Sequence, residues 1–139
     1  MKTENEESYQ ILGWIIQRAI KGFYTLIASP KMQEFVISHY KDLNIIIYDY
    51  REHEKHFHFD EISNWVRKNP NAGVYVLLNF QLALRTEEDI WRLNAERDLL
   101  AHIEKSLLFC MTEGKERELR KIAIDFCSFI REELCFIRR

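Results

Sequence analysis

The stretch that decides the fold is residues 73–110, which reads GVYVLLNF, QLALR, TEEDIWRLNAERDLLAHIE and KSLLFC. The first segment is apolar on both faces except for Asn79, which is typical of a strand covered by helices on both sides. Thr86, with Asp89 three residues later, is typical of a helix that starts with a capping box. A helix of about five turns would then lead to a second buried strand at 106–110. The stretch therefore predicts one β-α-β unit with a right-handed crossover.

Strand and helix signals alternate on both sides of this unit. Further strands are predicted at 23–28 (FYTLIA), 44–50 (NIIIYDY) and 134–137 (LCFI), and further helices at 7–20, 31–41, 115–130 and, in a short form capped by Asp60, after the charged loop at 51–55. Such alternation predicts an α/β fold, a three-layer α/β/α sandwich with a mostly parallel five-stranded sheet.

Two of these helices have apolar stripes at helical spacing. The helix after Ser29 and Pro30, a capping residue and a favoured first helical residue, is predicted to bury Met32, Phe35, Val36 and Tyr40. The helix at 115–130 is predicted to bury Leu119, Ile122, Ala123, Phe126 and Ile130.

Length and composition limit the class of protein. A chain of 139 residues favours one domain over 1–139, and 47% hydrophobic with 30% charged residues is typical of a folded globular protein. A net charge of −2 gives no electrostatic reason to expect nucleic acid or a membrane as partner, so both are excluded here. The polar, acidic N-terminus predicts no signal peptide. Cys110, Cys127 and Cys135 are odd in number and lie in apolar segments, which predicts reduced thiols in the cytoplasm.

Polar residues gather where the predicted strands end. Ligands of parallel sheets bind at the carboxyl edge of the strands, and that edge would carry Ser29, Lys31, Asp49, Arg51, Asn79, Gln81, Thr112 and Glu113. A nucleotide-binding sheet has the pattern GxxxxGK followed by Ser or Thr after its first strand, whereas residues 28–33 read ASPKMQ. An acid that holds Mg²⁺ is expected at the end of a central strand, whereas this chain has Asn79, a poorer ligand for that ion. We therefore predict no catalytic residue and no cofactor.

A second polar group lies on the helix that follows Thr86. Asn94, Arg97 and Asp98 are three and four residues apart and share one face. We expect them to form a structural polar network together with Asn79 and Asp125, in which Arg97 reaches Asp125 or a backbone carbonyl near a strand end. The alternatives are that this face is exposed to solvent or that it forms a ligand site.

Other reactive residues form no recognised catalytic pattern. His53, His56 and His58 lie in the segment REHEKHFHFD, with Glu52, Glu54 and Asp60. This segment could bind Zn²⁺ or Ni²⁺ adventitiously, but it lacks a spacing such as HExxH, and we interpret it as a polar loop. Cys110 has no evident histidine partner, and the chain contains no GxSxG motif. No metal site is predicted.

The chain resembles a degenerate P-loop NTPase-like domain of the STAND type, which precedes repeats in large bacterial signalling proteins. The resemblance covers roughly residues 8–137 and rests on an LNxxRDxL helix, an apolar strand and an AxDFxSF helix. Here these are Leu93, Asn94, Arg97, Asp98 and Leu100, then 107–110, then Ala123, Asp125, Phe126, Ser128 and Phe129. The resemblance implies a sheet of P-loop NTPase type with the strand order 5-1-4-3-2. It also implies a domain that often lacks an intact phosphate loop, as this chain does.

The sequence is compatible with three functions. The favoured one is a non-enzymatic module that binds a protein partner in a bacterial signalling or defence system, and a homo-oligomer is compatible with it. The second is a nucleotide-dependent enzyme with a non-standard phosphate site, and the third is a metal-dependent hydrolase that uses the His-rich loop. The missing glycine-rich loop and the missing strand-end acid favour the first over the second.

Overall fold

The computed structural model describes residues 4–53 and 56–136. Its elements in chain order are α1 (Glu4–Arg18), β1 (Gly22–Ile27), α2 (Pro30–Ser38), β2 (Ile45–Asp49), α3 (Phe59–Lys68), β3 (Val74–Leu78), the 3₁₀ helix η1 (Phe80–Ala83), α4 (Glu87–Ala95), α5 (Arg97–Ala101), β4 (Ser106–Met111), α6 (Glu113–Ile122), α7 (Ile124–Ser128) and β5 (Ile130–Cys135).

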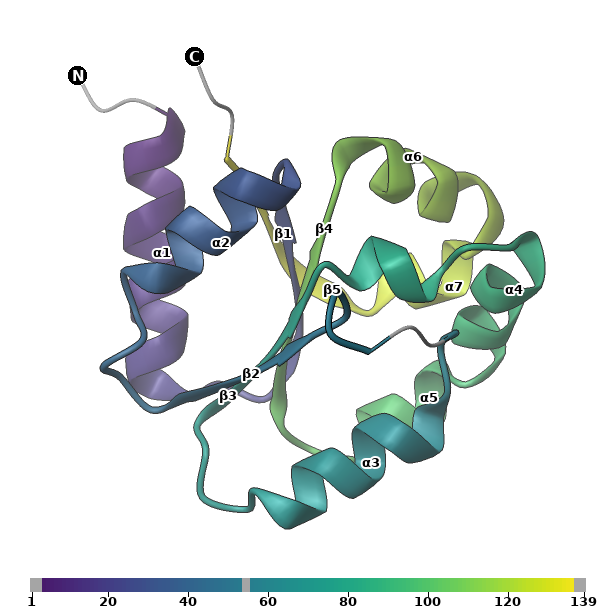
Figure 1. Cartoon of the computed structure of the whole chain (residues 1–139), viewed down its shortest axis with the longest axis horizontal. Coiled ribbons are helices and arrows are strands. Elements are labelled where there is room, and N and C mark those ends of the chain that lie inside the picture. The colour runs from purple at the N-terminus through teal and green to yellow at the C-terminus, as the bar shows by residue number, and fades with distance from the viewer. Residues whose placement is uncertain (1–3, 54–55, 137–139) are drawn as a thin grey trace.

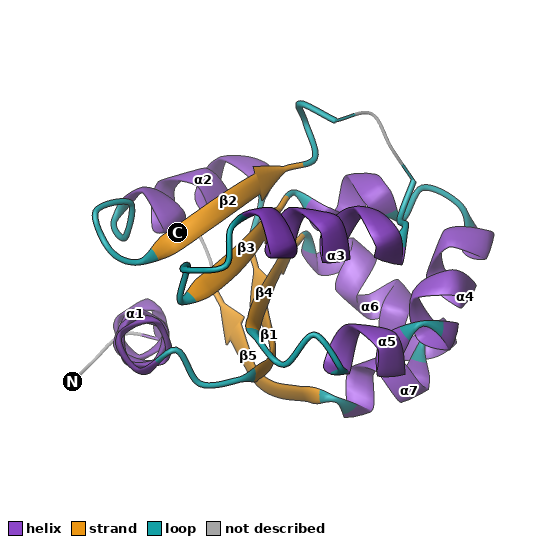
Figure 2. Ribbon diagram, turned by 90° about the horizontal axis from the view of Figure 1, so that it is seen from below, coloured by secondary structure: helices purple, strands orange, loops and turns teal. Residues whose placement is uncertain are grey.

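The strands, labelled in Figure 1, form a five-stranded sheet in the order β2-β3-β4-β1-β5, which can be followed in Figure 2. Every pairing in it is parallel, so the predicted α/β fold with a parallel sheet is confirmed. The order is the one that the family resemblance implied. It places β1 between β4 and β5, with β2 and β5 at the two edges.

Helices cover both faces of the sheet (Figure 2). The helices α1 and α2 lie on one face, and α3 to α7 lie on the other. Because strand side chains alternate between faces, Tyr24 and Leu26 pack in the first layer, whereas Phe23 and Ile27 pack in the second. Every residue of β3 and β4 is buried, which is why these strands read as continuous apolar runs.

Two of the three predicted helix caps are present, those of α4 and α2. The Thr86 side chain accepts from the Asp89 amide at 3.2 Å, and the Asp89 carboxylate accepts from the Thr86 amide at 3.0 Å, which completes the capping box of α4. Ser29 is the N-cap of α2 and Pro30 is its first residue. The predicted cap of α3 was wrong, since His58 is the N-cap and Asp60 lies in the first turn.

Two helices that the sequence predicted as continuous are interrupted. The helix after Thr86 breaks at Glu96 (φ −97°, ψ 11°), where the Arg97 guanidinium donates to the Asn94 carbonyl at 2.6 Å. The helix at 115–130 breaks at buried Ala123 (φ −103°, ψ 56°). The Arg97 contact is local, whereas just after Ala123 the Phe126 backbone amide donates to Asn94 Oδ1 at 2.8 Å across 32 positions of sequence. Periodicity alone reveals neither contact.

Other predicted boundaries and burials also change. Ile130 begins β5 instead of ending a helix, so β5 starts earlier than the predicted 134–137; Ile137 lies outside the described residues. Phe35 is 56% exposed, because the buried side of α2 consists of Gln33, Val36 and Ile37. None of the described helices is long and apolar enough to cross a membrane.

Candidate functional site

The connection between β1 and α2 is very short, consisting of Ala28 and Ser29. The Ala28 amide donates to the Met111 carbonyl at 3.0 Å and so extends the sheet. The Ser29 hydroxyl accepts from the Met32 amide at 3.3 Å, and Pro30 has no amide hydrogen. A phosphate loop needs several adjacent unpaired amides. This connection, all of it within the described chain, does not provide them.

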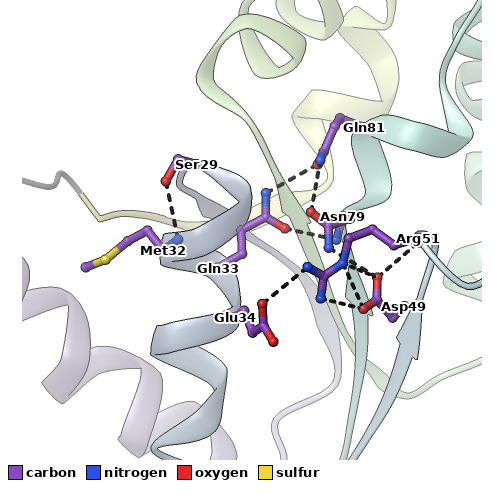
Figure 3. Close-up of polar contacts among 8 residues, drawn as sticks. All are labelled: Ser29, Met32, Gln33, Glu34, Asp49, Arg51, Asn79 and Gln81. Atoms are coloured by element: carbon purple, nitrogen blue, oxygen red, sulfur yellow. Dashed lines mark hydrogen bonds and ion pairs between the residues drawn. The ribbon is translucent and has the colours of Figure 1, made fainter.

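Gln33, in the second turn of α2, lies beside this connection and is completely buried. Its side-chain oxygen accepts a hydrogen bond from the backbone amide of Asn79 at 2.9 Å. Its side-chain nitrogen donates to the Ala28 carbonyl at 3.0 Å and to Gln81 Oε1 at 3.3 Å. Figure 3 shows the Gln33 side chain reaching from α2 toward the ends of the strands. Gln33 therefore joins α2, β1 and the segment after β3.

Asn79 directly follows β3 and is also completely buried. Its backbone is left-handed (φ 56°, ψ 41°), a conformation that Asn tolerates better than most residues. Its Nδ2 donates to Asp49 Oδ1 at 3.1 Å, and its Oδ1 accepts from Gln81 Nε2 at 3.1 Å. A carboxylate at this position could not donate to Asp49. The site therefore suits an amide and disfavours the acid of a magnesium site.

Asp49 and Arg51 close the arrangement at the end of β2. Arg51 Nη2 donates to Asp49 Oδ2 at 2.8 Å, and Arg51 Nη1 donates to Glu34 Oε2 on α2 at 3.2 Å (Figure 3). Partial burial alone would raise the pKa of Asp49, but hydrogen bonds from Arg51 and Asn79 outweigh it and hold that pKa below its usual value. The Asp49 carboxylate therefore remains charged, and its charge is balanced by Arg51 of the same chain.

We call these residues the strand-end network: Gln33, Glu34, Asp49, Arg51, Asn79 and Gln81. The structure brings together four of the residues that the sequence placed at the carboxyl edge, namely Asp49, Arg51, Asn79 and Gln81. Ser29 and Thr112 are instead the N-caps of α2 and α6, and Lys31 and Glu113 are exposed. The groups where a nucleotide and Mg²⁺ would bind in a P-loop enzyme are hydrogen-bonded to one another.

The polar residues of α4 and α5 form a separate group. Asn94 Oδ1 accepts from the Phe126 amide at 2.8 Å, and Asn94 Nδ2 donates to Asp125 Oδ2 at 3.4 Å. Arg97 is partly buried, donates to the Asn94 carbonyl, and lies over the Phe129 ring with its guanidinium carbon 5.9 Å from the ring centre. Asp125 thus pairs with Asn94 in this structure, whereas the sequence had suggested Arg97.

The remaining two members of the expected network lie apart from this group. The Asp98 side chain is exposed. Asn79 bonds within the strand-end network. The structure thus divides the expected polar network into two.

The histidines after β2 have different surroundings from one another. His56 Nδ1 lies 2.8 Å from Asp89 Oδ2, and the Asp89 side chain is only 4% exposed. Burial would raise the pKa of Asp89, but hydrogen bonds from His56 and Thr86 lower it below its usual value. His53 stacks on Tyr48 at 4.3 Å between ring centres. Glu54 lies outside the described residues, and the described ones contain no cluster of metal-ligating side chains.

The cysteines give no nucleophile. Cys110 is completely buried in β4, and burial raises the pKa of its thiol, so the reactive thiolate is disfavoured. None of the three cysteines, all within the described residues, forms a disulfide.

Sequence reasoning missed Gln33 and the pair of His56 with Asp89. A signal for Gln33 was present, because it lies three, four and seven residues before Val36, Ile37 and Tyr40, on the buried side of the helix. A polar residue in such a stripe requires a buried partner. No comparable signal in the sequence indicated the contact between His56 and Asp89.

Comparisons with known proteins support the fold alone. No protein-family model and no curated protein sequence matches the chain. Among solved structures, the ORC1 protein of Aeropyrum pernix, in complex with DNA, is similar with a TM-score of 0.53 and 11% sequence identity. The similarity covers 100% of this chain and 46% of that protein, so the chain spans less than half of its length. The chain thus has a fold of P-loop NTPase type.

The same comparison corrects one expectation. The net charge of −2 predicted no nucleic acid partner, whereas a similar fold occurs in a protein that was solved bound to DNA. The exclusion was wrong, because net charge describes the whole surface and does not decide what a local region binds.

Proposed function

We propose that this chain is a non-enzymatic protein-interaction or regulatory module, in which a P-loop-like fold is kept without a phosphate-binding loop. The strand-end network is the observation that carries this proposal. Gln33 and Asn79 are both completely buried and hydrogen-bonded to each other, and the connection of Ala28 and Ser29 is too short to wrap a phosphate. A nucleotide would have to break this network in order to bind.

The setting that we propose is a bacterial signalling or defence system, with residues 1–139 acting as one domain in the cytoplasm. The support is the resemblance of the LNAERDLL and AIDFCSF segments to STAND-type proteins. The odd number of cysteines in apolar segments, which predicts reduced thiols, supports the cytoplasmic location. In this reading the P-loop fold is a scaffold, and binding to a protein partner is its activity.

Nucleotide binding is the first test. Calorimetry with Mg²⁺-ATP and Mg²⁺-GTP should give no binding heat, and thermal melts should not change when nucleotide is added. A ligand at about 1,000 times its dissociation constant would stabilise the chain by about 4 kcal/mol, so binding would be evident. Micromolar affinity, about −8 kcal/mol, would overturn the proposal in favour of a nucleotide-binding enzyme with a non-standard phosphate site.

Protein binding is the second test. The tagged chain is purified from its native host, and the complex is then rebuilt from purified components without nucleotide. We expect a complex of defined stoichiometry that survives without nucleotide. A complex that forms only when Mg²⁺-nucleotide is present would contradict the proposal.

A further inference from the structure

A surface groove lies between α3 and α5, away from the strand-end network. Its volume is about 430 Å³, within the range of about 300–1,000 Å³ that is usual for binding pockets. Pro70 and Lys105, which line it, precede β3 and β4 in the chain. The groove is therefore near the amino ends of these strands, at the opposite edge of the sheet from Asn79.

Apolar side chains form much of the groove. Phe59 and Val66 come from α3, Leu99 comes from α5, and Ile103 follows α5. Leu99 is 49% exposed. A single exposed leucine is ordinary, but here it borders a hollow that other apolar side chains also line. An apolar hollow of this kind favours a ligand with apolar side chains.

The charged side chains that line the groove are basic. They are Arg67 and Lys105, and none of the described residues that line it is Asp or Glu. Arg67 Nη2 donates to the neutral side chain of Asn64 at 2.8 Å. Within the described chain, neither Arg67 nor Lys105 is within ion-pair distance of a carboxylate.

Helix electrostatics account for only part of this charge. Arg67 is in the last turn of α3, where a cation stabilises the helix dipole. Lys105 lies outside any helix, directly before β4. Its charge has no such role, and Lys105 lines both this groove and a neighbouring hollow that Glu104 also lines.

We propose that this groove binds an acidic peptide segment of a protein partner, whose large apolar side chains contact Leu99 and whose carboxylates pair with Arg67 and Lys105. The inference rests on the proposed function, since it names the site and the partner chemistry of the interaction module. A nucleic acid phosphate would satisfy the cations but would leave the apolar lining without a matching surface. A peptide that carries both kinds of group matches the charge and the apolar area together.

The experiment uses the intact chain as bait for a displayed library of random peptides. Enriched peptides should combine Asp or Glu with Leu, Ile, Phe or Trp, and the strongest one is labelled for fluorescence anisotropy. Leu99→Glu and Lys105→Glu should each weaken its binding by about tenfold or more. The matched controls are Ile124→Glu, since Ile124 is 64% exposed on α7, and Lys31→Glu on α2. Both controls should bind within about twofold of the unchanged chain.

Several outcomes would overturn the proposal: no enrichment, enrichment of basic peptides, or equal loss in the control variants. Duplex DNA that binds the unchanged chain and is lost with Lys105→Glu, but not with Leu99→Glu, would identify the groove as a nucleic-acid site instead. Thermal melts verify that each variant is folded, and Leu99→Gln replaces Leu99→Glu if the latter is not. Nucleotide binding is measured separately, so failure of the groove and failure of the proposed function give different results.

Discussion

The side-chain oxygen of Gln33 accepts a hydrogen bond from the backbone amide of Asn79 at 2.9 Å, and both residues are completely buried. This contact joins α2 to the end of β3 across 46 positions of sequence. In P-loop enzymes these two regions hold phosphate and Mg²⁺. Here the two regions are hydrogen-bonded to each other, so this edge of the sheet connects α2 to β3 and has a structural role.

Gln33→Leu should destabilise the chain by about 1–3 kcal/mol, because it leaves the buried Asn79 amide without its acceptor. Urea melts followed by circular dichroism measure this difference. Gln17→Leu is the control, since Gln17 is exposed on α1, and its effect should be within about 0.5 kcal/mol. If both variants unfold at the same urea concentration as the unchanged chain, the strand-end network contributes nothing to stability.

Asn79→Asp would introduce the acid that a magnesium site requires, yet we expect loss of stability and no gain of nucleotide binding. The new carboxylate would face Asp49 and lose the donor that Asn79 provides at 3.1 Å, so the free energy of unfolding should fall by about 1–3 kcal/mol at neutral pH. Asn71→Asp, at an exposed position, should be nearly neutral.

The pH dependence of Asn79→Asp has a defined sign. Two neighbouring carboxylates raise the pKa of one of them above its unfolded value. The penalty is therefore complete above the raised folded pKa, decreases as the pH falls toward the unfolded pKa, and disappears below it, when one group is protonated in both states. The variant should approach the unchanged chain in stability between neutral pH and about pH 4. A difference that is constant over this interval would contradict the pairing with Asp49.

The residues alone were sufficient for the layers, since the doubly apolar strand β3 and the capping box of Thr86 and Asp89 depend on neighbouring residues only. The strand order was implied by the family resemblance and not by these local patterns. The breaks at Glu96 and Ala123 could not be predicted in this way. Each lies beside a contact that involves Asn94: the Arg97 guanidinium binds its carbonyl, and the Phe126 amide binds its side chain across 32 positions of sequence. Asn94 and Phe126 become neighbours only after the chain has folded. Arg97 and Asn94 are only three residues apart, but helical periodicity does not indicate a contact between a side chain and a backbone carbonyl.

The sequence predicted where the candidate site lies, but it did not predict the hydrogen bonds within the site. Parallel strands bring Asp49 and Asn79 to the same edge, and this follows from topology. The hydrogen bonds among them depend on Gln33, which comes from another layer. The sequence therefore indicated the absence of a phosphate loop without indicating what replaces it.

Acid should destabilise the chain through Asp49 and Asp89. Hydrogen bonds lower the pKa of both carboxyl groups below the usual value. Each therefore contributes stability that is present above its unfolded pKa, about 3.9, and is lost as the pH falls through the lower folded pKa. Urea melts at a series of pH values should show a decline below about pH 4. Asp89→Asn should reduce this decline, whereas Asp98→Asn, at an exposed position, should not.

Asn94 should contribute more to stability than Arg97. Asn94→Ala removes the acceptor of the Phe126 amide in the short helix α7, and a lost cap of this kind costs about 1–2 kcal/mol. Arg97→Ala removes a hydrogen bond to the Asn94 carbonyl and a contact with the Phe129 ring. Its effect should be about 1 kcal/mol, because the guanidinium is only partly buried.

Urea melts of the two variants decide between a structural cap and a buried charge pair at this helix. Lys121→Ala on α6 is the control, since Lys121 is exposed, and its effect should be within about 0.5 kcal/mol. If Arg97→Ala instead costs about 3–5 kcal/mol, the guanidinium belongs to a fully buried ion pair. If the Asn94 side chain fixes the start of α7, the loss in free energy of unfolding should be largest for Asn94→Ala, smaller for Arg97→Ala and near zero for Lys121→Ala.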